Sequence, residues 1–593
     1  MSMKDSLGVL PEWDLSDLYS GRDSEKLACD IENSSKAGKA FEQTYKHKVG
    51  MLSGTELALA IEEFERIDEK LSAILSFAGL VHAGNVSDPD IGRFYQTSQE
   101  KVNEISSSLL FFTLEINQID DTVLDELLKT EELVHYHPWL RDVRAMRPYQ
   151  LDDKLEELLH EKSMSGRTAW IRLFDQTIAE MRFPFRGRKM TETEILNLFS
   201  DPETEVRKEA AECFGRVLGK NAKTFALITN TLAKDKEIEN RWRGFARPIS
   251  ARNLSNFVED EVVDALIEAV RSAYPRLSHR YYKLKAKWFG SDQLDYWDRN
   301  APLPHSDNRI IAWDDAKQTI IQAYDEFSPH LAKVGERFFD NAWIDAPVRP
   351  GKASGAFAHP TVPSAHPYLL LNYQGKVRDV MTLAHELGHG VHQVLAAEQG
   401  HLMADTPLTL AETASVFGEM LTFKSMLKTT HNPAERCVMI AGKVEDMLNT
   451  VVRQTAFCEF EKKVHAERKN GEITPDRIGD IWLNGQEESL GPALKFSPVY
   501  KNYWMYIPHF VHSPFYVYAY AFGDCLVNSL YSVYEAADSS FVDKYLHLLS
   551  AGGTLRHKEL LAPFNLNAAD PDFWTKGLGV IEGFIDELET LDL

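Results

Sequence analysis

The sequence predicts a mainly helical fold, and two observations support this class. Long stretches repeat their apolar residues with the period of an amphipathic helix, in residues 151–162 (LDDKLEELLHEK), 259–274 (EDEVVDALIEAVRSAY) and 543–553 (DKYLHLLSAGG). Alternating strand patterns are scarce, and the best candidate is the short apolar run at residues 366–375 (HPYLLLNYQG). We therefore expect helices along most of the chain, with few and short strands.

A domain boundary is expected near residue 190. In residues 182–190 (RFPFRGRKM), a proline, a glycine and several basic residues interrupt the helical pattern. Thr191 and Glu194 then stand at the spacing of a capping box, which marks a helix N-terminus, before a new apolar run. We divide the chain into an N-terminal helical domain, residues 1–190, and a second domain, residues 191–593.

Composition limits the class of protein. The chain has 593 residues, of which 44% are hydrophobic and 26% charged, as in ordinary globular proteins with a large core. Its formal net charge of −24 argues against a nucleic-acid partner, because phosphate binding requires a basic surface. The five cysteines are scattered, odd in number and without a CxxC pair, which favours free thiols in a reducing compartment.

No targeting or membrane segment is evident. The N-terminal residues lack a basic region followed by an apolar one, so no signal peptide is expected. The most apolar run, LLFFTLEI at residues 109–116, is too short to cross a bilayer. We therefore expect a cytoplasmic protein without a membrane partner.

The segment MTLAHELGHGVHQVL, residues 381–395, contains an HExxH motif. Because residues four apart share a helix face, His385 and His389 can direct ring nitrogens at one zinc ion. Glu386 lies about 100° round the helix from His385, where a carboxylate can take the proton of a metal-bound water. An ordinary helix with three polar residues would look the same, so a third ligand has to decide.

The residues just after the motif do not supply that ligand. The metzincin pattern requires glycine at position 391 and histidine at position 395, where this chain has Val391 and Leu395. Glu398 is 13 residues beyond His385, about 20 Å along a continuous helix, so it cannot reach the same ion.

A second helix is expected after a break at Gly400. Thr406 and Pro407 suit the N-cap and first turn of this helix. If it returns antiparallel, it brings Glu412 or Glu419 to the level of the histidines. These two acids are seven residues apart and share a face, so spacing leaves open which one binds the metal and which one orients a ligand histidine.

A third cluster lies in residues 502–524 (NYWMYIPHFVHSPFYVYAYAFGD). Aromatic residues at helical spacing usually indicate core packing. Peptide hydrolysis, however, passes through a tetrahedral oxyanion, for which tyrosine hydroxyls and imidazole N–H groups are suitable donors. Tyr516 and Tyr520 are four residues apart and can point together into a cleft. The candidates in this cluster are His509, His512, Tyr516, Tyr518 and Tyr520.

Taken in order, these motifs resemble the oligoendopeptidase F branch of the thimet-oligopeptidase family of zinc metallopeptidases. The resemblance rests on HELGH, then LAETASVFGE at 410–419 and HFVHSPFYVYAYAFG at 509–523. It extends over essentially the whole chain, through LPEWDLSDLY at 10–19, DYWDRNAPLP at 295–304, IDAPVRPGKASGAF at 344–357 and DPDFWTKGLGVIEGFIDELE at 570–589.

The resemblance implies a role for each matching residue of the motif. It makes His385, His389 and Glu412 the ligands of one zinc ion per chain and Glu386 the general base. Glu419 is then a candidate for orienting a ligand.

The same resemblance implies contacts with the substrate. His509 and Tyr520 match the family's late histidine and tyrosine, which contact the substrate and the oxyanion. Spacing differs there from the thimet-type members, so Tyr516, Tyr518 and His512 stay candidates. An edge strand that pairs with the substrate backbone would fall around Gly355–Phe357, which includes Ala356.

The implied fold is a mainly helical, elongated metallopeptidase with a deep channel between two halves and a small β-sheet near the zinc. Such a channel admits short extended peptides. We expect a zinc endopeptidase that hydrolyses internal bonds of oligopeptides. The alternatives are a peptidyl-dipeptidase or carboxypeptidase-like enzyme that trims chain ends, and a non-catalytic helical peptide-binding protein. Sequence alone leaves the oligomeric state open.

Overall fold

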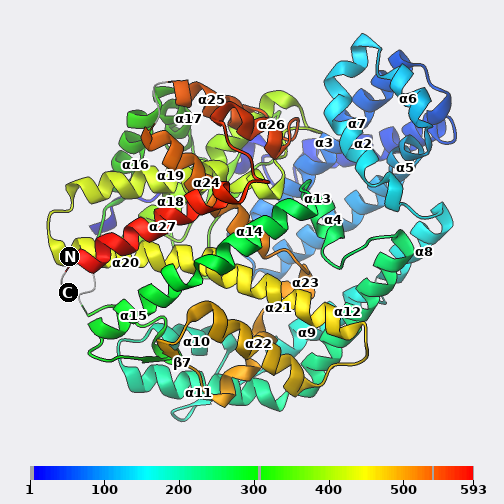
Figure 1. The fold of residues 1–593 in the computed structure, drawn as a ribbon. Helices are drawn as coiled ribbons and strands as arrows, with labels where there is room; N and C mark the ends of the chain where they lie inside the picture. The colour runs from blue at the N-terminus through cyan, green and yellow to red at the C-terminus, as the bar shows by residue number, and fades with distance from the viewer. Residues whose placement is uncertain (1–5, 164, 305–308, 537–539, 592–593) are drawn as a thin grey trace. The chain divides into compact units, whose positions relative to one another are not determined.

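The structure is a computed structural model that describes residues 6–163, 165–304, 309–536 and 540–591. Helices make up most of it, with a few two- and three-residue strands (Figure 1). The predicted mainly helical class is therefore confirmed. No helix in the described ranges combines the length and apolar character that crossing a bilayer requires.

The chain forms two compact units, each assembled from three separate segments. Unit 1 comprises Met1–Pro148, Asn308–Thr429 and Ala537–Phe564, and unit 2 comprises Tyr149–Asp307, Thr430–Ala536 and Asn565–Leu593. Unit 1 contains the helices α2 (Glu25–Tyr45), α3 (Gly54–Gly84), α4 (Pro89–Ser107), α5 (Leu110–Gln118), α6 (Asp121–Leu127), α7 (His137–Ala145), α16 (Trp313–Phe327), α17 (Pro329–Asp340), α18 (Val377–Ala396), α19 (Leu408–Thr429), α25 (Ser540–Ser550) and α26 (His557–Leu561).

Helices α18 and α19 form an antiparallel pair at the centre of unit 1 and lie side by side in Figure 1. Helices α17 and α25 pack on α18, while α16 packs on α19. A three-stranded sheet lies against α18, in the order β4 (Ile344–Asp345), β6 (Tyr368–Leu370), β5 (Phe357–His359). Strand β4 is parallel to β6 and β5 antiparallel to it, so β5 forms an edge of the sheet.

Unit 2 is a second helical bundle with two small sheets. Its helices are α8 (Asp153–Ser163), α9 (Arg167–Glu180), α10 (Glu192–Asn197), α11 (Thr204–Lys220), α12 (Ala222–Arg243), α13 (Ser250–Ser255), α14 (Asp260–Ala273), α15 (Ser278–Trp288), α20 (Pro433–Thr450), α21 (Val452–Arg468), α22 (Pro475–Leu490), α23 (His509–His512), α24 (Tyr518–Ala536) and α27 (Pro571–Thr590). The sheets pair β1 (Phe183–Phe185) with β2 (Arg188–Met190) and β3 (Leu294–Asp295) with β7 (Leu494–Lys495). Helix α27 packs along α24, α14 and α20, and its Trp574 is fully buried against Phe522.

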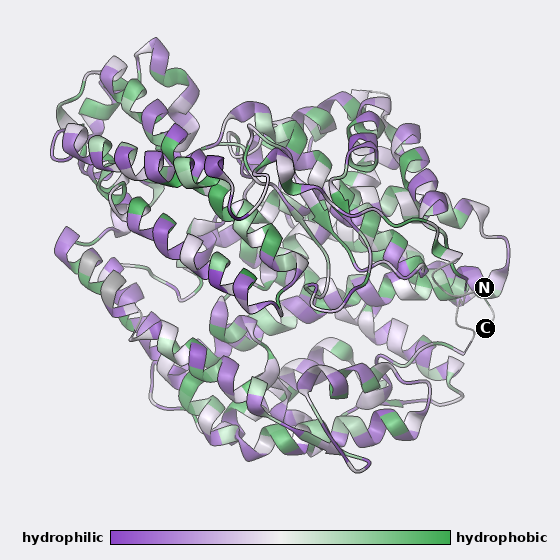
Figure 2. Cartoon of the chain, turned by 180° about the vertical axis from the view of Figure 1, so that it is seen from behind, coloured by the Kyte–Doolittle hydropathy of each residue, from purple (hydrophilic) through white to green (hydrophobic). Residues whose placement is uncertain are grey.

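Local sequence signals predict several elements correctly. Helices α14 and α25 form in the predicted stretches, and β6 occupies three residues of the predicted apolar run. Helix α10 begins with the expected capping box between Thr191 and Glu194. Figure 2 shows hydrophilic and hydrophobic residues alternating along the helices, as amphipathic packing requires.

Two further expectations have clear outcomes. All five cysteines are free thiols, as predicted. Helix α8 forms where the sequence predicts it, but Leu155, Leu158 and Leu159 remain exposed, so its apolar stripe does not enter a core.

Candidate metal centre

Helix α18 carries the HExxH motif in its middle turns. Its start is fixed by Asp379, whose carboxylate accepts the backbone N–H groups of Lys376 and Gln374 at 3.0 and 2.9 Å. The helix ends in a short 3-10 turn, and Gly400, which follows this turn, has a φ of 82°. The next helix, α19, begins at Leu408, one residue later than the predicted first turn at Pro407. Two consecutive helices therefore carry the proposed metal ligands, the neighbouring Glu386 and Glu419.

Two histidines and one glutamate meet between these helices. The Nε2 atoms of His385 and His389 each lie 3.4 Å from Glu412 Oε2, and the three possible ligand atoms lie within 4.8 Å of one another. Ligands bound tetrahedrally at zinc distances are about 3.3 Å apart, so the spacing fits a single zinc ion. No other such group of histidine, cysteine and acidic residues occurs among the described residues.

The two glutamates of α19 meet different atoms of the histidines. Glu412 faces Nε2 of both rings, and its Oε2 also accepts a hydrogen bond of 2.7 Å from Ser415. Glu419 reaches the opposite side of one ring, with Oε2 at 3.2 Å from His385 Nδ1. This arrangement distinguishes the two acids that spacing left equivalent. Glu412 can be a ligand, and Glu419 can orient His385 and hold its tautomer.

Charges in the group shift its pKa values strongly. Burial alone would lower the pKa of His385, but the hydrogen bond to Glu419 and the charges of Glu412 and Glu419 raise it to about 9. Burial would raise the pKa of Glu412, yet the hydrogen bond and charge of His389 lower it to about 2. A divalent cation that binds here has to replace the proton on His385, so binding weakens as pH falls.

Glu386 is buried, whereas the three possible metal ligands are only partly buried. Burial raises its pKa, and the charges of His385 and His389 only partly offset this. The backbone N–H of Ala358 on β5 is near this carboxylate and lowers its pKa slightly. The carbonyl of the same residue lies 3.5 Å from the side-chain amide of Gln393. At Ala358 the free edge of β5 therefore faces α18, a contact that no sequence pattern indicated.

The structure places the edge strand slightly later than expected. Strand β5 begins at Phe357, so Gly355 and Ala356 lie in the segment just before it. The amide of Asn372 anchors this segment by donating to the carbonyl of Gly355 at 2.9 Å. His359 lies on β5, and His366 lies in the following segment, where its Nε2 is 2.9 Å from a carboxylate oxygen of Asp17.

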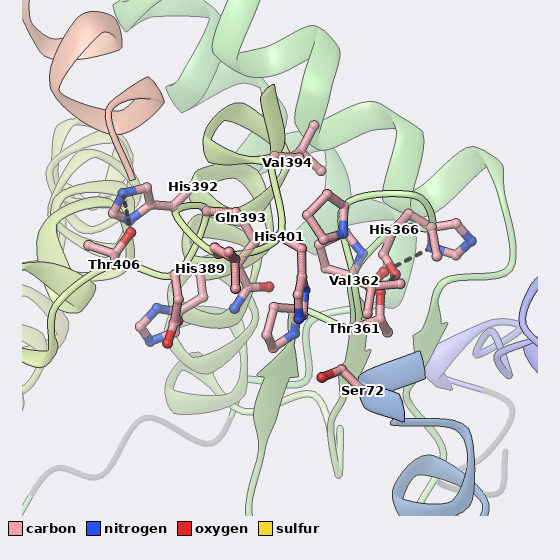
Figure 3. Close-up of a pocket in the computed structure, with 18 of the residues that line it drawn as sticks. Ser72, Thr361, Val362, His366, His389, His392, Gln393, Val394, His401 and Thr406 are labelled. Carbon is pink, nitrogen blue, oxygen red and sulfur yellow. Dashed lines mark hydrogen bonds between the residues drawn. The ribbon is translucent and has the colours of Figure 1, made fainter. Parts of the chain in front are cut away.

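A cavity of about 620 Å³ opens beside His389, within unit 1 (Figure 3). One wall is the face of α18 that carries His389, His392 and Gln393, and the segment after β5 forms another. His392 is buried and contacts the hydroxyl of Thr406 at 3.4 Å, as Figure 3 shows. Its pKa is lowered to about 4 by burial and by the charge of His389, so it is neutral at pH 7.

The candidate residues in the late aromatic cluster of unit 2 differ in their exposure and contacts. His509 Nε2 lies 3.4 Å from the Tyr520 hydroxyl, and the rings of Tyr516 and Tyr520 are 5.3 Å apart. Tyr518 instead turns into the core, where its hydroxyl accepts a 2.8 Å hydrogen bond from the side-chain amide of Asn256. His512 is exposed, and its Nε2 lies 2.7 Å from Asp175 Oδ1. The partly exposed members are therefore His509, Tyr516 and Tyr520.

The turn before these tyrosines is strained and held by a buried acid. Phe515 has a φ of 61°, in the left-handed region that a bulky side chain rarely adopts. Glu461 on α21 accepts its backbone N–H at 2.8 Å. Burial raises the pKa of Glu461 to about 8. Sequence analysis missed Glu461, because its partner lies 54 residues away.

Comparison with known proteins gives a consistent family. The family described as Peptidase family M3 matches residues 197–580, and the one described as Oligopeptidase F matches residues 115–183. Oligopeptidase PepF of Bacillus subtilis is 25% identical over 561 residues, which cover 92% of this chain and 82% of the relative. The chromosomal oligoendopeptidase F of Lactococcus lactis subsp. cremoris is 26% identical over 607 residues, 98% of this chain and 97% of the relative.

Solved structures share the fold over nearly the whole chain. A crystal structure of a Chlamydophila abortus protein matches with a TM-score of 0.87 at 21% identity, covering 100% of this chain and 99% of the other. The oligoendopeptidase-F of Enterococcus faecium matches with a TM-score of 0.71 at 21% identity, covering 95% and 97%.

The helical fold and the group of two histidines and a glutamate define a class, the zinc metallopeptidases of the HExxH type. Because the family match spans well over half of the chain, the protein belongs to peptidase family M3, and its full-length relatives place it in the oligopeptidase F branch. It is therefore a zinc-dependent endopeptidase that acts on peptides.

Proposed function

We propose that this endopeptidase cleaves short oligopeptides in the cytoplasm and holds one zinc ion through His385, His389 and Glu412. The observation that carries the ligand assignment is the pair of 3.4 Å separations from Glu412 Oε2 to the two histidine Nε2 atoms. Relatives that bear the name oligoendopeptidase support the substrate class. Five free thiols support a reducing compartment, and the net charge of −24 supports the absence of a nucleic-acid partner.

Glu386 is the proposed general base. When bound, zinc supplies Lewis-acid chemistry that polarises the scissile carbonyl and acidifies the attacking water. Glu386 accepts one proton from that water and delivers it to the nitrogen of the leaving amine, so the carboxylate is regenerated. A raised pKa suits both transfers, and the N–H of Ala358 is near the carboxylate. Glu419 keeps His385 in the tautomer that leaves Nε2 free for the metal.

Tyr520 and His509 are the proposed oxyanion donors. Because His509 Nε2 and the Tyr520 hydroxyl are only 3.4 Å apart, both can donate a hydrogen bond to the same oxyanion. Tyr516 is an alternative donor because its ring lies beside that of Tyr520. The hydroxyl of Tyr518 is engaged by Asn256, which favours a packing role for this tyrosine.

Substrate backbone contacts are proposed at Gly355, Ala356 and the edge strand β5. Support comes from the position of β5 at the edge of its sheet, with Ala358 beside Glu386. His512 is also a candidate for a substrate contact, and its Nε2 lies 2.7 Å from Asp175 Oδ1. We also propose the division at residue 190, since the two family matches end at 183 and begin at 197.

The test is Glu386→Gln, which keeps the size of the side chain and removes its charge. The variant should bind one zinc ion per chain and lose activity by about 10²- to 10⁴-fold, the usual contribution of a general base. Glu398→Gln is the matched control, because Glu398 is exposed and lies beyond the end of α18. Normal turnover by Glu386→Gln would refute the assignment.

Product mapping separates the endopeptidase from the enzymes that trim chain ends. Mass spectrometry of a mixed peptide library should find internal cuts that disappear when a chelator removes the metal. Products that consist only of terminal amino acids or dipeptides would favour the carboxypeptidase or peptidyl-dipeptidase alternative.

A further inference from the structure

Two buried tyrosines contact the ligand helices next to their proposed ligands. Tyr324 on α16 is fully buried, and its hydroxyl donates a 2.8 Å hydrogen bond to the backbone carbonyl of Ala384. Ala384 immediately precedes His385. The tyrosine is 60 residues away in sequence, so the contact links a separate helix to the metal site.

The second tyrosine does the same on the other ligand helix. Tyr545 on α25 is fully buried, and its hydroxyl donates a 2.8 Å hydrogen bond to the carbonyl of Thr413. Thr413 immediately follows Glu412. The ring of Tyr545 lies 4.5 Å from that of Phe417 and 5.4 Å from that of Phe327, which connects it to both α19 and α16.

These hydrogen bonds are additional to the backbone hydrogen bonds of the two helices. Inside an α-helix, each carbonyl already accepts the N–H of the residue four positions later. Ala384 and Thr413 therefore accept a second donor that the backbone ladder does not require. In both helices, that donor meets the backbone carbonyl of a residue next to a proposed zinc ligand.

Tyr324 also lies where the two ligand helices meet. A Cβ atom placed on Gly418 of α19 would come within 2.1 Å of the Tyr324 hydroxyl, so only glycine leaves room for it. One hydroxyl therefore bonds α18 and packs on the backbone of α19. Burial and the charge of Glu419 raise the pKa of Tyr324, which keeps its hydroxyl protonated as a donor.

We propose that Tyr324 and Tyr545 are positioning residues, which hold α18 and α19 at the spacing that zinc binding by His385, His389 and Glu412 requires. The inference rests on the proposed ligand assignment. A metal-binding group has to be held within about 0.5 Å of its productive geometry, so a small movement of one helix along the other weakens binding. The tyrosine hydroxyls bond backbone carbonyls rather than ligand side chains, so they act through the backbone of the ligand helices.

Tyr324→Phe and Tyr545→Phe test the proposal, since each keeps the ring and removes one hydroxyl. Zinc affinity is measured by competition with a chromogenic chelator, and the cobalt(II)-loaded protein is examined by visible absorption, which reports coordination geometry. The zinc affinity of each variant should fall at least about 10-fold, as it does when other groups that orient metal ligands are removed. Its cobalt spectrum should shift, and the double variant should lose more affinity than either single one.

The matched control is Tyr503→Phe. Tyr503 of unit 2 is buried and donates to the carbonyl of Ala211 on α11 at the same 2.8 Å distance. This variant loses an equivalent hydrogen bond and should keep the wild-type zinc affinity and cobalt spectrum.

The outcomes separate this inference from the proposed ligand assignment. If both tyrosine variants bind zinc as tightly as Tyr503→Phe, the positioning role is wrong. If His389→Ala retains wild-type zinc affinity, the ligand assignment itself is wrong. Should one tyrosine variant not fold, the other carries the same test, because each alone is expected to weaken binding.

Discussion

Replacement of Gly388 by alanine should separate the two ligand helices. A Cβ atom at this position would lie 2.5 Å from the carbonyl oxygen of Ala414 and 2.6 Å from the Cα atom of Ser415. Ordinary van der Waals contact begins at 3.4 Å, and both obstacles are backbone atoms that cannot rotate away. To restore that contact the helices must move apart by about 0.9 Å, more than the ~0.5 Å within which a binding site has to be held.

Both zinc binding and stability should respond. Gly388 lies between the two ligand histidines in sequence, and Ser415 is hydrogen-bonded to Glu412, so the displacement falls on the ligand group itself. Zinc affinity should fall at least 10- to 100-fold. Overpacking costs about 1–3 kcal/mol, and the better helix propensity of alanine offsets about 1 kcal/mol of this. The free energy of unfolding of the metal-free protein should therefore fall by up to about 2 kcal/mol.

Chelator competition measures the zinc affinity, and urea unfolding of the metal-free protein measures stability. Gly442→Ala on α20 is the matched control, because no atom lies within 4 Å of its Cβ position. The control should keep its zinc affinity and gain up to about 1 kcal/mol of stability from helix propensity. If Gly388→Ala behaves like Gly442→Ala, the close contact between α18 and α19 does not set the ligand geometry.

Three further predictions follow from the described contacts. Glu419→Gln should lower zinc affinity about 10- to 100-fold, because a neutral amide orients His385 less well than a carboxylate; unchanged affinity in chelator competition would contradict this. Tyr520→Phe should lower kcat by about 10²-fold or more, whereas Tyr518→Phe should cost about 1 kcal/mol of stability and leave kcat unchanged; equal kinetic effects would argue against the separation of the two tyrosines. The pKa of Glu461 is raised from 4.5, its ordinary value, to about 8 in the folded chain. At pH values between these two, Glu461 is protonated in the folded chain and ionised in the unfolded chain. The free energy of unfolding should therefore fall as pH rises through that window, by on the order of 5 kcal/mol, and Glu461→Gln should flatten the dependence; an equally steep pH profile in the variant would exclude this acid as the cause.

Much of the metal site follows from local sequence. The four-residue spacing of His385 and His389 is enough to place both rings on one helix face, because helical geometry depends only on nearby residues. The break at Gly400 and the return helix likewise follow from turn and capping signals. The class of fold follows from the apolar period for the same reason.

Local spacing could not distinguish residues that share a period. Glu412 and Glu419 lie on one face of α19. Only the packing of α19 against α18 places Glu412 beside the histidine Nε2 atoms and Glu419 beside the Nδ1 atom of His385. Tyr518 shares the sequence cluster of Tyr516 and Tyr520. The left-handed turn at Phe515 precedes α24, and in the folded chain Tyr518 is buried while its neighbours are partly exposed.

The sequence by itself therefore determined the helical class, the pair of histidines and the neighbouring base, since these depend on contacts within a few residues. Tertiary structure alone decided which distant groups contact the two helices of the metal site. Tyr324, Tyr545 and Ala358 reach the site from separate segments, and nothing in their immediate sequence marks them. Their contacts arise from the close packing of whole helices and strands, which depends on the complete set of side chains at each interface.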